Sequence, residues 1–134
     1  MRYEDWPDRL AAYLEARTFT PFAWGTNDCA VFANNAIAAI LKDAPTADLT
    51  MRYRSQKGAY KWLLDRDATD LWDFVDKYYV RIPAPMARRG DVVAHMTTDK
   101  SVGVCVGQYF ATPSDEGIIL GSMQTEAIHA WRID

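Results

Sequence analysis

Cysteine and histidine are scarce in this sequence, with two of each among 134 residues. Cys29 and Cys105 do not form a C-x-x-C pair, and His95 and His129 are not at metal-ligand spacing. We therefore predict that the chain holds no metal and uses no cofactor. Two reduced thiols are the simplest expectation, although a disulfide between Cys29 and Cys105 is conceivable.

Long apolar runs and an excess of basic charge are also missing. The longest aliphatic run, Ala36–Leu41, is far too short to cross a bilayer, so no membrane insertion is expected. A net charge of −3 argues against a nucleic-acid-binding surface. The first five residues lack the basic and apolar parts of a secretory signal, which predicts a chain that folds in the cytosol.

The residues that are present fit a single domain spanning residues 1–134, with 49% apolar and 25% charged residues. Helical periodicity dominates the first half of the chain. Four residues are expected to cap its helices: Asp5, Asn27, Ser55 and Thr69. Strand-like segments follow at residues 91–96, 102–110, 117–120 and 127–133. Helices first and an antiparallel sheet second predict an α+β fold.

The segment Ser101–Gly107 alternates strictly between bulky and small residues. Its valines share one face of the expected strand, and the serine, cysteine and glycines share the other. A bare face lets a helix backbone approach closely. We therefore expect the apolar helix that begins near Cys29 to pack on the small-residue face.

Three motifs in the chain, PFAWGTNDCAVF, ARRGDVV and SVGVCVG, together resemble the NlpC-type bacterial cell-wall peptidases in order and spacing. The resemblance extends from about Pro21 to Leu120. It implies a papain-like fold, in which a central cysteine-bearing helix packs on a C-terminal antiparallel sheet. The chain is also similar to small proteins of this kind that are encoded near phage tail genes.

Carried over by position, the resemblance makes Cys29 the nucleophile. A thiol in the first turn of a helix is favoured as a thiolate by the helix dipole and by free backbone N–H groups. The family's histidine base corresponds to Ser101, and its third polar residue corresponds to Thr112. Neither hydroxyl can accept a proton near neutral pH, so the resemblance favours an inactive site.

The substrate-binding positions implied by the resemblance are Phe22, Trp24 and Asp28. Phe22 stands where the family has a tyrosine, so the hydroxyl that helps bind substrate is missing. From the residues alone, Phe19, Phe22 and Trp24 are expected to cover the core above the central helix.

His95 is a possible substitute base. If the strand pairing sets His95 opposite Ser101, the two share a face and His95 can approach Cys29; if Met96 is opposite Ser101, His95 faces away. The length of the turn leaves both alternatives open. His129 is expected to be a structural strand residue that is satisfied by hydrogen bonds.

Three functions remain as hypotheses. The favoured one is a non-catalytic, structural NlpC-like component of a phage or prophage tail, made in the host cytoplasm and then carried in the virion among other tail or baseplate proteins. The second is an active cysteine peptidase or amidase that cleaves peptidoglycan stem peptides and uses Cys29 with His95. The third is a small-molecule thiol-transfer enzyme. Large side chains near both ends, including Tyr3, Trp6, Trp131 and Ile133, predict an exposed apolar patch that binds a partner.

Overall fold

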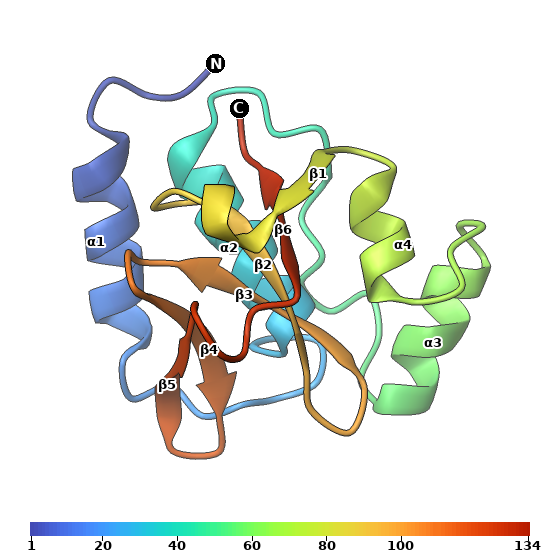
Figure 1. The fold of residues 1–134 in the computed structure, drawn as a ribbon. Helices are drawn as coiled ribbons and strands as arrows, with labels where there is room; N and C mark the ends of the chain where they lie inside the picture. The colour runs from blue at the N-terminus through green and yellow to red at the C-terminus, as the bar shows by residue number, and fades with distance from the viewer.

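The computed structural model describes residues 1–134 and has an α+β architecture with four α-helices and a six-stranded antiparallel sheet (Figure 1). The helices are α1 (Trp6–Arg17), α2 (Cys29–Ile40), α3 (Gln56–Leu64) and α4 (Leu71–Asp76), and a short 3-10 turn, η1, covers Ala84–Met86. The strands are β1 (Val80–Pro83), β2 (Val92–Met96), β3 (Lys100–Cys105), β4 (Tyr109–Ser114), β5 (Gly117–Ser122) and β6 (His129–Arg132). No helix is both long and apolar enough to cross a membrane.

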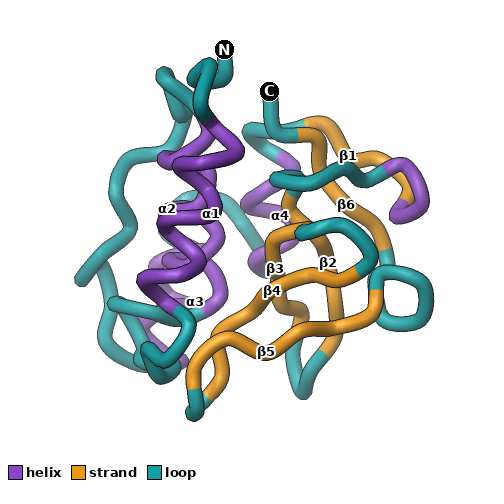
Figure 2. Tube along the Cα trace, turned by 90° about the vertical axis from the view of Figure 1, so that its left-hand side faces the viewer, coloured by secondary structure: helices purple, strands orange, loops and turns teal.

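The sheet has the strand order β1-β6-β2-β3-β4-β5, and every neighbouring pair is antiparallel. Figure 2 shows α1, α2 and α3 on one side of this sheet. Helix α2 packs against β3 and β4, and α1 packs on the outside of α2. A helix that is apolar around most of its circumference, as α2 is, requires such a central position. The expected layout of a central cysteine-bearing helix on a C-terminal sheet is therefore present.

The face of β3 that contacts α2 is the opposite of the expected one. Val102 and Val104 belong to the main core together with Phe32 of α2. At Gly103 the small-residue face turns away from the helix, and a Cβ there would meet the ring of Phe110 and the carbonyl oxygen of Ala111, each at 2.8 Å. Burying the valines removes more apolar area from water, which outweighs the closer backbone approach that a bare face allows.

Two of the expected helix caps are displaced by one residue. Asp28, rather than Asn27, caps α2 by accepting a hydrogen bond from the Val31 N–H, and Asp70 takes the place of Thr69 at α4. A carboxylate is a strong acceptor at a helix N-terminus, where free N–H groups and the dipole favour negative charge. Ser55 caps α3 as expected. Asp5 makes no capping bond to α1, and its side chain pairs with Arg9 instead.

The strand half of the chain is more divided than its sequence suggests. The expected strand 102–110 is two strands, because the chain turns at Gly107, which has a φ of 117°. Strand β1 was not expected, since two prolines mark this stretch as a break, yet Pro83 stands at an edge of the sheet where a missing N–H costs least. The predicted hairpin between residues 91–96 and the following strand is confirmed as β2 and β3.

The two ends of the chain meet, and they do not form the expected apolar patch. Trp131 and Ile133 are fully buried, and Trp6 packs against the main core. The Arg2 guanidinium lies over the Trp6 ring and donates two hydrogen bonds to the Ile133 carbonyl oxygen. Trp131 and Ile133 therefore belong to the interior, and Tyr3 and Trp6 are half-buried.

Candidate functional site

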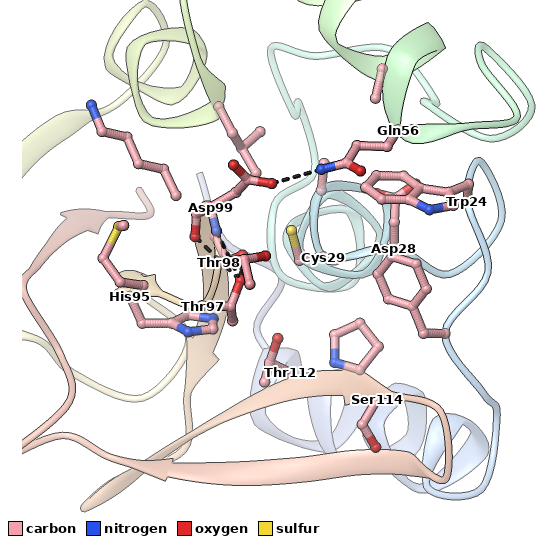
Figure 3. Close-up of a pocket in the computed structure, with 18 of the residues that line it drawn as sticks. Trp24, Asp28, Cys29, Gln56, His95, Thr97, Thr98, Asp99, Thr112 and Ser114 are labelled. Carbon is pink, nitrogen blue, oxygen red and sulfur yellow. Dashed lines mark hydrogen bonds between the residues drawn. The ribbon is translucent and has the colours of Figure 1, made fainter.

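One large cavity, of about 930 Å³, opens where the start of α2 meets α3, the β2–β3 turn and the β4–β5 hairpin. All seven residues that the sequence singles out as site positions line it: Phe22, Trp24, Asp28, Cys29, His95, Ser101 and Thr112. Figure 3 shows the labelled side chains around the Cys29 sulfur, with Trp24 and Gln56 to one side and His95 and Asp99 to the other. The fold thus brings together segments that are far apart in sequence.

Cys29 is the first residue of α2, and its thiol lies near the Val102 backbone and the Ser101 side chain. Burial raises the pKa of this thiol to about 11, and the polar groups of Val102 and Ser101 oppose the rise only in part. The negative charge of the neighbouring Asp28 raises the pKa further. At neutral pH the group is therefore a protonated thiol, in spite of its place at a helix start.

Asp28 is buried, and its carboxylate is fully engaged within the protein. It accepts hydrogen bonds from the Gly25 N–H at 2.8 Å, from the Val31 N–H at 3.0 Å and from the Tyr53 hydroxyl at 3.0 Å. These bonds fasten the loop before α2 to the helix and to the segment before α3. The carboxylate thus fixes the position of Cys29.

Ser101 and Thr112 lie where β3 and β4 separate. The two strands pair only at Val104 with Ala111 and at Cys105 with Phe110. Beyond those pairs the Thr112 hydroxyl donates to the Val102 carbonyl oxygen at 3.3 Å. The start of α2 stands at this fork, which explains why the Cys29 thiol lies near backbone and hydroxyl groups of β3.

The strand register sets His95 directly opposite Ser101, so the two side chains share a face. The His95 ring stacks on Phe110, with 4.6 Å between the ring centroids, and the residue is only 6% exposed. Its Nε2 atom has no hydrogen-bond partner in the protein. Burial lowers the pKa of His95, so the neutral ring is favoured at pH 7, while the Val102 backbone and Glu126 act in the opposite direction.

His129 is absent from the cavity wall. Its ring lies edge-on to Trp72 and Trp131, with centroid separations of 5.0 and 4.7 Å. Its Nε2 has no hydrogen-bond partner, so aromatic contacts hold this residue in place of the expected hydrogen bonds.

The aromatic loop before α2 does not cover the core as expected. Phe19 is 86% exposed, and Phe22 and Trp24 meet edge to face at 5.0 Å on the cavity wall. Trp24 retains 38% of its surface in solvent. The loop therefore gives the cavity an accessible aromatic wall.

Several cavity residues carried no sequence signal. Tyr60 of α3 is 39% exposed and lines the cavity. Asp99 belongs to a polar turn, and its carboxylate accepts a hydrogen bond from the Gln56 amide at 2.7 Å. Only the packing of α3 beside the β2–β3 turn reveals these positions.

No group of three or more histidine, cysteine or acidic side chains is arranged to hold a metal ion, and both cysteines are free thiols. Residues 1–133 match the family model described as a domain of unknown function, DUF6950. The chain belongs to this family. No curated protein matches the sequence.

Proposed function

We propose that this DUF6950 chain is a catalytically silent relative of the NlpC-type peptidases, with a papain-like fold, that serves as a structural component of a phage or prophage tail. The observation that carries the proposal is the environment of Cys29. Its thiol lies beside a serine hydroxyl, and its pKa is about 11. A cysteine nucleophile needs a base or a lowered pKa, and this thiol has neither in Ser101.

The tail setting rests on the resemblance to small proteins encoded near phage tail genes. In this role the domain contacts other tail or baseplate proteins and keeps the cavity of its relatives without their chemistry. Peptidoglycan remains a possible ligand of such a cavity.

The hydrolysis assay tests the silent site directly. The purified chain is incubated with peptidoglycan fragments that carry stem peptides, and the products are followed by mass spectrometry. We expect no release of peptides. Release that disappears in Cys29→Ala would overturn the proposal.

A second experiment restores the missing base. Ser101→His places an imidazole beside the Cys29 thiol, where an imidazolium–thiolate pair lowers the thiol pKa. We expect alkylation of Cys29 by iodoacetamide at pH 7 to accelerate at least about tenfold, since the rate follows the thiolate fraction. Ser101→Asn, a polar control without a base, should leave the rate low. Equal rates in both variants would show that Ser101 does not occupy the position of a base.

The alternative function is an active cysteine peptidase or amidase that uses His95 as the base. It is favoured by one observation, that His95 shares the cavity with Cys29 and has a lowered pKa, as a neutral base requires. Under this alternative, His95→Phe abolishes peptide release as completely as Cys29→Ala does.

A separate experiment tests whether the chain is part of a phage tail. Particles from a lysate are separated by size and density, and the fractions are analysed by mass spectrometry. We expect the chain to co-sediment with tail proteins. Its recovery only as a free monomer would contradict the structural role.

A further inference from the structure

The cavity around Cys29 has an excess of negative charge. Five acidic residues line it: Asp28, Asp70, Asp99, Asp115 and Glu126. The wall includes one basic side chain, Lys100, which pairs with Asp70 at 2.9 Å. Asp28 is buried and engaged within the protein.

Three of the carboxylates, those of Asp99, Asp115 and Glu126, form no salt bridge and reach solvent. Such a set attracts a positively charged group and repels an anionic one.

A buried acceptor without a partner faces the same cavity. His95 is 6% exposed, and its Nε2 atom makes no hydrogen bond. Figure 3 shows its ring turned toward Thr97 and Thr112, on the side of the cavity. A buried polar atom without a partner costs free energy, and a ligand N–H that reaches it recovers that cost. Glu126 lines the same cavity, and its charge acts to raise the pKa of this ring against the larger effect of burial.

Aromatic surface lies within the same wall. Trp24 and Tyr60 are 38% and 39% exposed. The Asp99 carboxylate lies close enough to Tyr60 to help raise the pKa of its hydroxyl, after the effect of burial. Carboxylates beside aromatic faces are suited to an ammonium or guanidinium group, which gains from both the charge and the ring quadrupole.

The size and rim of the cavity suit a polypeptide better than a free amine. Its volume of about 930 Å³ lies near the upper limit for drug-sized ligands. On its rim, Ile119 and Leu120 of β5 are 52% and 59% exposed. Apolar side chains of a bound segment can cover these residues, and β5 is an edge strand of the sheet.

We propose that the cavity binds an extended segment of a partner protein that carries a lysine or arginine, with the cationic group at Asp99 near Tyr60 and a ligand N–H donated to Nε2 of His95. The choice of a protein as the ligand rests on the tail role proposed above. The bound segment stays intact, because no covalent step is involved.

The test uses the full chain and a short capped peptide, acetyl-Ala-Leu-Lys-Ala-Phe-amide. Its control carries N-acetyl-lysine at the same position. Binding is followed by two-dimensional NMR of the ¹⁵N-labelled protein. We expect the lysine peptide to shift the amides of Asp99 and Ser101 and the indole of Trp24. The acetylated peptide should bind about tenfold more weakly, because it lacks both the ion pair and the cation–π contact.

Variants then assign the contacts. Asp99→Asn should weaken the lysine peptide about threefold to fivefold at low salt, and less at high salt. Asp43→Asn, the same change of charge at an exposed loop residue outside the cavity, should have no effect. His95→Phe keeps an aromatic ring against Phe110 and removes the acceptor, so it should weaken both peptides by a similar factor.

Four results would overturn the proposal. They are an absence of binding at millimolar peptide, equal affinity for the two peptides, amide shifts confined to other faces of the protein, and tighter binding of peptidoglycan stem fragments than of the lysine peptide. A mass spectrum of the recovered peptide separates this proposal from the proposed function. Cleavage that requires Cys29 would refute the silent site and leave the recognition of a basic segment intact.

Discussion

Two buried carboxylates organise two different regions of this molecule. Asp91 and Asp28 are 0% and 1% exposed, and each accepts hydrogen bonds from two backbone N–H groups. The Asp91 carboxylate is also held by the Arg132 guanidinium at 3.1 Å, with Arg2 at 3.8 Å. Asp28 has only the Tyr53 hydroxyl in addition. One buried charge has cationic partners, and the other depends on hydrogen bonds and the start of a helix.

This difference in partners separates a region that holds the fold together from a region that is suited to bind a ligand. Around Asp91, both oxygens have partners, and the two ends of the chain are joined. Around Asp28, burial raises the pKa of Cys29 and of Tyr53, and the Asp28 carboxylate, which has no cationic partner, adds to both rises. The adjoining cavity keeps a His95 nitrogen without a hydrogen-bond partner and acidic groups without a salt bridge. Buried polar groups that have all their hydrogen-bond partners within the protein stabilise the fold. Polar groups that lack such partners remain available to a ligand.

The largest expected effect is at the paired carboxylate. Asp91→Ala leaves Arg132 and the N–H groups of Arg88 and Ile133 without their acceptor and should lower the free energy of unfolding by about 3–5 kcal/mol. Urea denaturation of the variant measures the loss. Asp43→Ala, at an exposed carboxylate, is the control and should change stability by less than about 0.5 kcal/mol. Similar stabilities for the two variants would show that the ends of the chain are held by other contacts.

Gly103→Val tests the tight packing behind β3, on the side away from α2. The added side chain meets the Phe110 ring and the Ala111 carbonyl oxygen, so we expect a loss of about 1–3 kcal/mol in urea denaturation.

The double variant Gly103→Val with Phe110→Leu separates the two sources of strain. If the ring is the obstacle, part of the loss is recovered relative to the sum of the single variants. Additive losses would place the strain at the backbone of Ala111.

Asp28→Asn should have a smaller effect than Asp91→Ala. The amide keeps one acceptor oxygen but turns N–H donors toward a backbone N–H or the Tyr53 hydroxyl, so we expect a loss of about 1–2 kcal/mol in thermal or urea unfolding. The same change removes a negative charge beside Cys29 and should lower the pKa of that thiol, which the pH dependence of its alkylation reports. If Asp28→Asn lowers the free energy of unfolding as much as Asp91→Ala does, the two carboxylates contribute equally to stability and the proposed difference between them is wrong.

The smallest expected effect is the loss of stability that His95 causes at acidic pH. The pKa of His95 is lowered from 6.5 by burial, so the folded state favours the neutral ring. Its contribution to stability is complete above pH 6.5 and is lost as the pH falls through the folded-state pKa. Between pH 7 and pH 5, His95→Phe should therefore lose less stability than the parent chain. If the stability of the two proteins falls in parallel between pH 7 and pH 5, the protonation of His95 does not contribute to the loss in this pH range.

Much of the fold could be predicted from local pattern. The helix that begins at Cys29, the cap at Ser55 and the β2–β3 hairpin all follow from periodicity and turn chemistry. Aromatic placement was less predictable, because Phe19 and Trp131 are both large apolar residues in short segments. One is 86% exposed and the other is fully buried. Large apolar residues tend to be buried, but the volume of the core decides which of them are.

The residues of the candidate site also fall into a predictable and an unpredictable group. Its seven sequence-derived residues line one cavity, whereas Gln56, Tyr60 and Asp99 join them only because α3 packs beside the β2–β3 turn. Nothing local in a polar turn or on a helical face indicates which distant segment it will meet.

By itself, the sequence determined the order of helices and strands, the helical position of Cys29 and the two unequal faces of β3. These follow from side-chain period and capping chemistry, which act within a few residues. The tertiary structure alone decided that the valine face meets α2 and that His95 stands opposite Ser101. Those outcomes depend on the total apolar area buried and on the length of one turn, where a shift of a single residue exchanges the two faces of a strand.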